Sequence, residues 1–158
     1  MQKATAMKGN SGTRSVDKTH TGRGNFFTQD ELSRFHTDIN RVFPVKYDRV
    51  SDDVARELAR DRVGTVFAPK GDVENVSISK LHPCQDGINA KNTMALFDSI
   101  RNEGIKEPAT ALRVGDEVYL LDGHHRVAAA IIAGKKEVPL RIVKATKQEW
   151  DKAIRKSR

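Results

Sequence analysis

The sequence predicts an α+β fold in which a small mixed sheet packs against helices. Three observations lead to this class. Short β-prone runs alternate with amphipathic helical patterns between residues 76 and 143. Two of these runs, 110–114 and 118–121, flank a glycine-aspartate turn typical of a hairpin. A last run, 138–143, follows a helical stretch, so hairpin and crossover links are both expected in one sheet.

The composition indicates one domain with appendages. The chain has 158 residues, of which 37% are hydrophobic and 6% aromatic, low values for a fully globular chain. Its net charge of +7 lies at the ends: residues 1–25 carry five basic and one acidic side chain, and residues 135–158 carry nine and three. The ends thus hold +4 and +6 and the middle −3. This distribution predicts a polyanionic partner, although basic tails that only aid solubility fit the composition equally well.

The sequence shows no feature of a secreted or membrane protein. Cys84 is the single cysteine, and there is neither a signal-peptide pattern nor a long apolar run. We therefore expect a cytoplasmic protein that makes no membrane contact. Residues 1–25 are rich in Gly, Ser, Thr and Lys and lack apolar periodicity, which predicts a disordered basic tail.

Residues 26–69 are predicted to form a helical extension. Its first helix should begin at a Thr28 capping box, run to about Val42 and stop before the following proline. Its second helix should be capped by the Ser-Asp-Asp segment 51–53 and run to about Arg62. The apolar stripe of the first helix consists of Leu32, Phe35, Ile39 and Val42.

Residues 70–145 are predicted to form the main domain. A strand over 76–81 and a helix over 89–103 precede the hairpin. After it comes an alanine-rich helix, 126–133, followed by a glycine that can close it at its C′ position. A second capping box then begins a basic C-terminal helix over 146–158.

The Asp-Gly-His-His-Arg segment at residues 122–126, here called the DGHHR turn, is the predicted functional site. It joins the end of a strand to the first turn of a helix, where free backbone N–H groups and the helix dipole favour an anion. Arg126 is suited to bind phosphate oxygens with two parallel hydrogen bonds. Gly123 would provide a tight turn or a close approach of the backbone to phosphate. The segment therefore predicts a phosphate site.

The other side chains of the turn have open roles. Asp122 could hold Mg²⁺ or act as a base, or it could cap the helix by accepting from the N–H of His124 or His125. The two histidines point about 100° apart on a helix, so one is expected to face the ligand and the other the sheet. Arg126 could instead pair with Asp122 or Glu103.

The motifs in this region resemble those of the ParB/sulfiredoxin superfamily. The main motif of this resemblance is Asp-Gly-His-His-Arg-x-x-Ala, which is followed later in the chain by a glycine and by Val-Pro. Residues 76–85 resemble the family's opening strand and its "hydrophobic-x-P-x-Q" segment, and residues 99–108 resemble its helix end and following loop. The resemblance covers roughly residues 76–143 and implies a ParB/sulfiredoxin-like fold for 70–145.

Within this superfamily the chain is similar to short ParB-like nucleases, many of them from phages and mobile elements. That resemblance implies metal-assisted hydrolysis of DNA phosphodiesters, in the host cytoplasm if the protein is phage-encoded. Asp122, with a divalent metal such as Mg²⁺, and His124 or His125 would activate water, while Arg126 and the helix N-terminus hold the phosphate. The residues expected to approach the turn from the opening loop are His82 and Gln85.

Other branches of the superfamily supply alternatives. Sulfiredoxins have a reactive cysteine where this chain has His124, so sulfinic-acid repair is not expected. Partition proteins of the ParB type have Glu-Arg-Arg after the glycine and grip CTP with the arginines, of which Arg126 alone matches. Free-serine kinases also begin with Asp-Gly-His, which makes a phosphotransferase that uses a nucleoside di- or triphosphate the runner-up; Gln85 stands about where these kinases carry an acidic residue.

A third alternative is a non-catalytic DNA-binding module. Its phosphate contacts, independent of DNA sequence, would come from the basic face of the C-terminal helix. The side chains concerned are Lys147, Lys152, Arg155 and Lys156.

Overall fold

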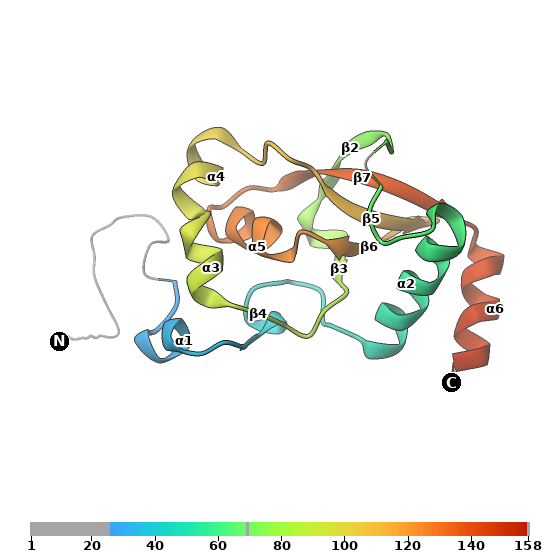
Figure 1. Ribbon diagram of the computed structural model, residues 1–158, viewed down its shortest axis with the longest axis horizontal. Coiled ribbons are helices and arrows are strands. Elements are labelled where there is room, and N and C mark those ends of the chain that lie inside the picture. Colours follow the sequence, from blue (N-terminus) through green and yellow to red (C-terminus); the bar gives the residue numbers. More distant parts are fainter. Residues whose placement is uncertain (1–25, 69, 158) are drawn as a thin grey trace.

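The computed structural model describes residues 26–68 and 70–157, so the tail predicted over residues 1–25 lies outside the described part. Helices and strands are interspersed along the chain (Figure 1). In order they are α1 (Gln29–Ser33), β1 (Thr37–Asp38), a 3-10 turn η1 (Ile39–Arg41), α2 (Arg49–Val63), β2 (Val73–Ser77), a second 3-10 turn η2 (Ile78–Lys80), β3 (Leu81–Pro83), β4 (Gly87–Ile88), α3 (Ala90–Ala95), α4 (Phe97–Glu103), β5 (Ala109–Val114), β6 (Glu117–Asp122), α5 (His124–Ile132), β7 (Glu137–Ala145) and α6 (Lys147–Ser157).

Five strands form one mixed sheet in the order β2-β7-β5-β6-β3. The predicted hairpin pairs β5 with β6 antiparallel, whereas β5 with β7 and β3 with β6 run parallel. The prediction of an α+β fold with a small mixed sheet is therefore confirmed. In the part of the chain that is described, no helix combines the length and the apolar character needed to span a bilayer.

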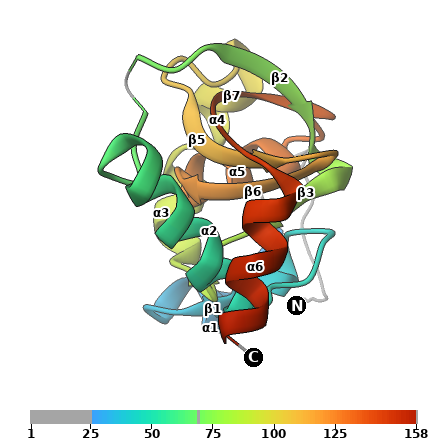
Figure 2. The same cartoon turned by 90° about the vertical axis from the view of Figure 1, so that its right-hand side faces the viewer.

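The sheet separates two apolar cores, because successive strand residues point to opposite faces. Ala111 and Leu120 belong to the core that includes α5, whereas Leu112 and Tyr119 belong to the core beneath α2 and α6. Figure 2 shows α2 and α6 side by side on their face of the sheet. The expected helical extension contributes to both cores, with Phe27, Ile39 and Phe43 in the first and Val54, Ala55 and Leu58 in the second.

The first predicted helix is wrong beyond its opening turn. The capping box at Thr28 is present, but α1 ends at Ser33, and Phe35 from the predicted stripe is 94% exposed. The next residues form β1, which pairs antiparallel with β4, and the Asp38 carboxylate accepts the Asn40 N–H to start η1. Strand pairing between distant segments overrides the local helical pattern here.

Of the next two predictions, one is confirmed with a shift and the other needs correction. The second helix exists as α2, but the Asp48 carboxylate caps it, accepting the Ser51 N–H at 3.0 Å. The strand predicted over 76–81 is interrupted, because the Ser77 hydroxyl accepts the Ser79 N–H and starts η2. As a result β2 and β3 lie at opposite edges of the sheet.

The helix predicted over 89–103 is divided at Leu96. The Leu96 N–H bonds the Thr93 carbonyl at 3.1 Å, three residues back, which closes α3 with a 3-10 turn before α4 starts. The remaining elements match their predictions closely. Gly134, at φ 84°, follows α5, and Thr146 and Glu149 form the second capping box.

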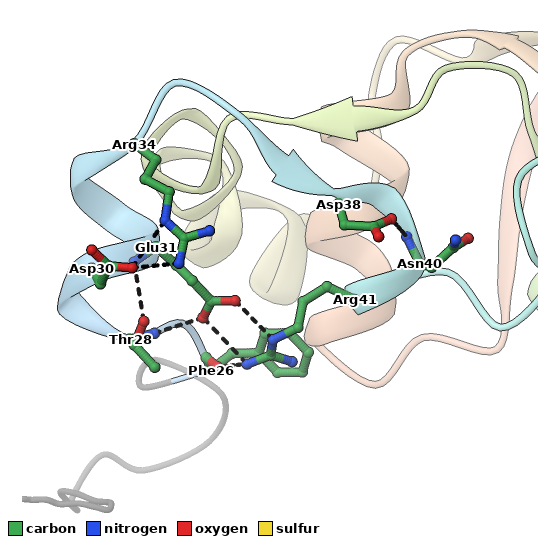
Figure 3. Close-up of polar contacts among 8 residues, drawn as sticks. All are labelled: Phe26, Thr28, Asp30, Glu31, Arg34, Asp38, Asn40 and Arg41. Atoms are coloured by element: carbon green, nitrogen blue, oxygen red, sulfur yellow. Dashed lines mark hydrogen bonds and ion pairs between the residues drawn. The ribbon is translucent and has the colours of Figure 1, made fainter.

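Arg41 of η1 fastens the first described residues to the domain (Figure 3). Its guanidinium lies 4.4 Å from the centroid of the Phe26 ring, and Nη2 donates to the Phe26 carbonyl at 2.7 Å. Its Nε donates to Glu31 Oε2 at 3.0 Å, while Glu31 Oε1 accepts the Thr28 N–H at 2.9 Å. Glu31 is buried, so one carboxylate joins α1 to η1.

Replacing Arg41 by alanine is expected to lower the free energy of unfolding by about 1–2 kcal/mol, since a partly buried ion pair and a cation–π contact are lost together. The matched control is Arg34→Ala, whose pair with Asp30 is at least half exposed and is expected to contribute less than about 0.5 kcal/mol. Urea denaturation of both variants measures the difference, and equal losses would contradict the proposed anchoring.

Candidate functional site

The DGHHR turn lies close against the start of β5. Gly123 has φ 87°, a left-handed conformation that favours glycine. A Cβ at this position would lie 2.6 Å from the Cβ of Ala109, so the backbone fits here only without a side chain. Glycine is therefore required twice over, by backbone conformation and by packing.

The N-terminus of α5 has no side-chain cap. The first hydrogen bond of the helix runs from the Val127 N–H to the Gly123 carbonyl at 3.0 Å, so the N–H groups of residues 124–126 precede it. Of the roles left open for Asp122, the helix cap is not observed. Its carboxylate instead lies 3.7 Å from Nη2 of Arg126, which is one of the two ion pairs predicted for that arginine. An uncapped helix N-terminus of this kind favours a bound anion.

His124 is a buried, neutral side chain. It is 2% exposed, and its Nε2 accepts the Cys84 N–H at 2.9 Å, which places the ring proton on Nδ1. The pKa of His124 is lowered to about 3, chiefly by burial and to a lesser extent by the nearby charges of Arg56 and His125, while a backbone hydrogen bond with Leu120 acts in the opposite direction. Its ring therefore braces the backbone at Cys84.

His125 binds the same stretch of backbone. Its Nε2 accepts the Asn89 N–H at 3.1 Å, and burial lowers its pKa. The sequence predicts that one histidine faces a ligand and the other the sheet. Both Nε2 atoms instead contact residues 84–89, here called the 84–89 segment, which connects β3 to α3 and includes β4.

Arg126 lies beside the turn with its guanidinium oriented by backbone carbonyls. Nη1 donates to the carbonyl of Glu107 and lies 3.5 Å from that of Pro108. The side chain is 30% exposed, and its Cζ would lie 3.5 Å from a Cβ placed on Gly123. The cation is thus fixed next to the uncapped helix end, with part of its surface open to solvent.

His82 does not lie at the turn, which corrects the prediction. Its ring stacks on Tyr119 with centroids 4.5 Å apart, and its Nε2 lies 2.5 Å from a carboxylate oxygen of Glu117, at the opposite end of β6 from Asp122. Gln85 lies in the 84–89 segment as expected, with its amide donating to the Gly87 carbonyl at 2.7 Å. Of the two, Gln85 alone neighbours the site.

The basic residues of α6 lie away from the turn. Trp150 stacks on Tyr119 and holds α6 on the face of the sheet opposite α5. Lys147 forms an exposed pair with Asp151 at 2.7 Å. Lys152, Arg155 and Lys156 are exposed on the same helix.

A metal site built from protein ligands alone does not fit the turn. Nowhere among the described residues do three His, Cys, Asp or Glu side chains gather as a metal set. Asp122 is the acidic side chain of the DGHHR turn, and both histidine Nε2 atoms already accept N–H groups. A divalent ion would need ligand oxygens from a bound phosphate.

One residue at the site was not anticipated. Arg56 of α2 donates through Nη2 to the Cys84 carbonyl, while the N–H of Cys84 donates to Nε2 of His124. Nothing in the sequence marks Arg56, because an arginine on a predicted amphipathic helix usually faces solvent. Its role depends on the packing of α2 against the sheet.

One family model and two curated proteins match parts of this chain. A family model described as the ParB N-terminal domain matches residues 63–155. The probable plasmid-partitioning protein ParB of Thermus thermophilus is 41% identical over 59 residues, which cover 37% of this chain and 20% of that protein. The uncharacterized protein MJ0188 of Methanocaldococcus jannaschii is 36% identical over 63 residues, covering 39% and 23%. The matched region is about a fifth of the length of these relatives.

Two of the solved structures that this chain matches are a sulfiredoxin and a ParB protein. Sulfiredoxin from Arabidopsis thaliana has a TM-score of 0.43 and 22% identity, covering 52% of this chain and 97% of that one. The C-terminally truncated chromosome-partitioning protein ParB from Caulobacter crescentus, complexed with CTP-gamma-S, has a TM-score of 0.42 and 22% identity, covering 54% and 52%. The family assignment follows from the sequence match, which spans more than half of the chain. This chain belongs to the ParB N-terminal domain family.

Proposed function

We propose that this chain binds a phosphate group of a nucleotide or of DNA at the N-terminus of α5. The observation that carries the proposal is the nine-residue helix α5, which starts after Gly123 without a side-chain cap. Its first N–H groups and its dipole supply hydrogen bonds and partial positive charge to an anion. Membership of the ParB N-terminal domain family supports a partner of this class.

Arg126 supplies the full positive charge of the proposed site. Because backbone carbonyls of residues 107 and 108 already orient its guanidinium, little side-chain entropy is lost when a phosphate binds. His124 and His125 contribute differently. They are neutral acceptors that hold the 84–89 segment, so we assign them a positioning role at this site.

Hydrolysis of a phosphodiester is a second proposal, favoured by Asp122. Its carboxylate side chain is 36% exposed beside Arg126, at the place where a phosphate would bind. Mg²⁺ is often held by one or two carboxylates together with substrate phosphates and water, and the turn fits that arrangement only with a phosphate in place. Binding receives the more direct support, because neither histidine Nε2 is free to accept a proton from water.

The test of phosphate binding uses tripolyphosphate, the four nucleoside triphosphates with Mg²⁺ and a short DNA duplex. A probe at a hundred times its dissociation constant is expected to stabilise the full chain by about 2.7 kcal/mol in thermal unfolding. Arg126→Ala should weaken binding roughly tenfold to a hundredfold, the loss expected for a charge-assisted hydrogen bond. Lys136→Ala, beyond the other end of α5, is the matched control. Unchanged affinity in Arg126→Ala would refute the proposed site.

The same variants separate the competing activities. A nuclease should nick plasmid DNA with Mg²⁺ and lose that activity in Asp122→Ala. A phosphotransferase should consume nucleotide and leave DNA intact. A DNA-binding module that relies on α6 should keep its duplex affinity in Arg126→Ala and lose affinity, with a shallower salt dependence, when the exposed cations are replaced. Those cations are Lys152, Arg155 and Lys156.

A further inference from the structure

We propose that Arg56 of α2 is a positioning residue for the phosphate site, acting through Cys84 and His124. The inference depends on the proposed function, because it concerns the same helix N-terminus. It adds a requirement to the proposed function: phosphate binding at α5 depends on a residue of α2, a helix that packs on the opposite face of the sheet.

Cys84 is held from both sides through its backbone. Its N–H donates to Nε2 of His124 at 2.9 Å, and its carbonyl accepts from Nη2 of Arg56. His124 is the first residue of α5, directly after Gly123. Any shift of Cys84 is therefore transmitted to the first turn of the helix that the phosphate would contact.

Arg56 is itself fixed by a chain of hydrogen bonds. Its Nε donates to Asp52 Oδ1 at 2.6 Å, and the Tyr47 hydroxyl donates to Asp52 Oδ2 at 2.7 Å. Asp52 is buried, and the side chain of Arg56 is 24% exposed. Burial and the neighbouring Asp52 carboxylate raise the pKa of Tyr47, so this hydroxyl keeps its proton and remains a donor.

Further contacts join the N-terminal part to this segment beyond Cys84. The Asp86 carbonyl accepts the Ile39 N–H at 2.9 Å, and β1 pairs with Gly87 and Ile88 of β4. Residues 26–62 thus bind the 84–89 segment, as do His124 and His125. Residues 26–62 lie outside the region that matches the family model, 63–155. The contacts that they make with the 84–89 segment therefore come from a part of the chain that the family model does not cover.

The experiment compares Arg56→Gln, Arg56→Lys and Asp52→Asn with the unmodified full chain. Tripolyphosphate affinity is one readout, and the hydrogen-exchange rate of the Cys84 amide by NMR is the other. Arg56→Gln is expected to weaken binding about tenfold, the size typical for losing a group that orients a binding residue. The Cys84 amide should exchange faster while amides of β5 keep their rates. Arg56→Lys, which retains the charge and a donor, should recover part of both effects.

The control is Arg60→Gln, one turn further along α2 at an exposed position, which should change neither readout. If Arg56→Gln fails to fold, Asp52→Asn loosens the same arginine and should give the same direction of change. An unmodified chain that binds no tripolyphosphate overturns the proposed function and this inference with it. If the unmodified chain binds and either readout is unchanged in the folded variants, the inference alone is overturned.

Discussion

Replacing Gly123 by alanine is expected to lower the free energy of unfolding by about 2–5 kcal/mol and to abolish phosphate binding. An L-residue in the left-handed conformation costs roughly 1–2 kcal/mol, and overpacking adds about 1–3 kcal/mol. The second contribution arises because the new Cβ would lie 2.6 Å from the Cβ of Ala109 and 3.3 Å from its Cα. Neither atom belongs to a flexible side chain, so the turn or β5 must move. Urea denaturation measures the stability loss, and tripolyphosphate titration measures the binding.

Gly134→Ala is the matched control for this prediction. Gly134 has φ 84°, nearly the value of Gly123, but no atom lies within 4 Å of its added Cβ. Its alanine variant should therefore show the backbone strain alone, about 1–2 kcal/mol. The difference between the two variants isolates the close approach of the DGHHR turn to β5. Equal losses would show that this approach contributes nothing.

The sequence was sufficient to predict the elements with local signals. The hairpin, α5 and α6 were predicted with bounds correct to within three residues, because a turn, a capping box and a helix-ending glycine each mark one place in the chain. The family resemblance identified the DGHHR turn for similar reasons, since its spacing is local. The family assignment confirms that resemblance at the level of the superfamily.

The first predicted helix and the predicted place of His82 failed because of contacts between distant segments. The amphipathic pattern after Thr28 predicts one long helix, and nothing local shows that Thr37 and Asp38 pair with β4. His82 was placed near the turn by its position in a loop, whereas stacking on Tyr119 carries it to the other end of β6. The sequence also gives no sign of the contact between Arg56 and Cys84, because these residues meet only when α2 packs against the sheet.

The lowered pKa values of His124 and His125 predict that the fold loses stability in mild acid. The free energy of unfolding is expected to fall by about 2 kcal/mol between pH 7 and pH 5 through His124 alone. Its pKa is lowered from 6.5 to about 3 in the folded chain, so the unfolded chain binds the proton more readily. Stability is therefore full above pH 6.5 and is lost as the pH falls toward 3. The lowered pKa of His125 adds a contribution of the same sign.

The interval above pH 5 separates this effect from carboxylate titration. Glu149 has a pKa of about 2, held down by its hydrogen bond to the Thr146 backbone and then by Arg62, so its contribution is lost only in stronger acid. Urea denaturation at pH 7 and pH 5 gives the measurement, and His124→Gln should flatten most of the difference, with His125→Gln removing a smaller part. Equal stability at the two pH values would contradict a buried neutral His124.

A protonated Nε2 cannot accept the Cys84 N–H. The same acid that destabilises the fold should therefore release the 84–89 segment from α5 and weaken phosphate binding. An imidazolium by itself would have the opposite effect, because it would attract the anion. The direction of the binding change between pH 7 and pH 5 therefore distinguishes a bracing histidine from one that contacts the ligand.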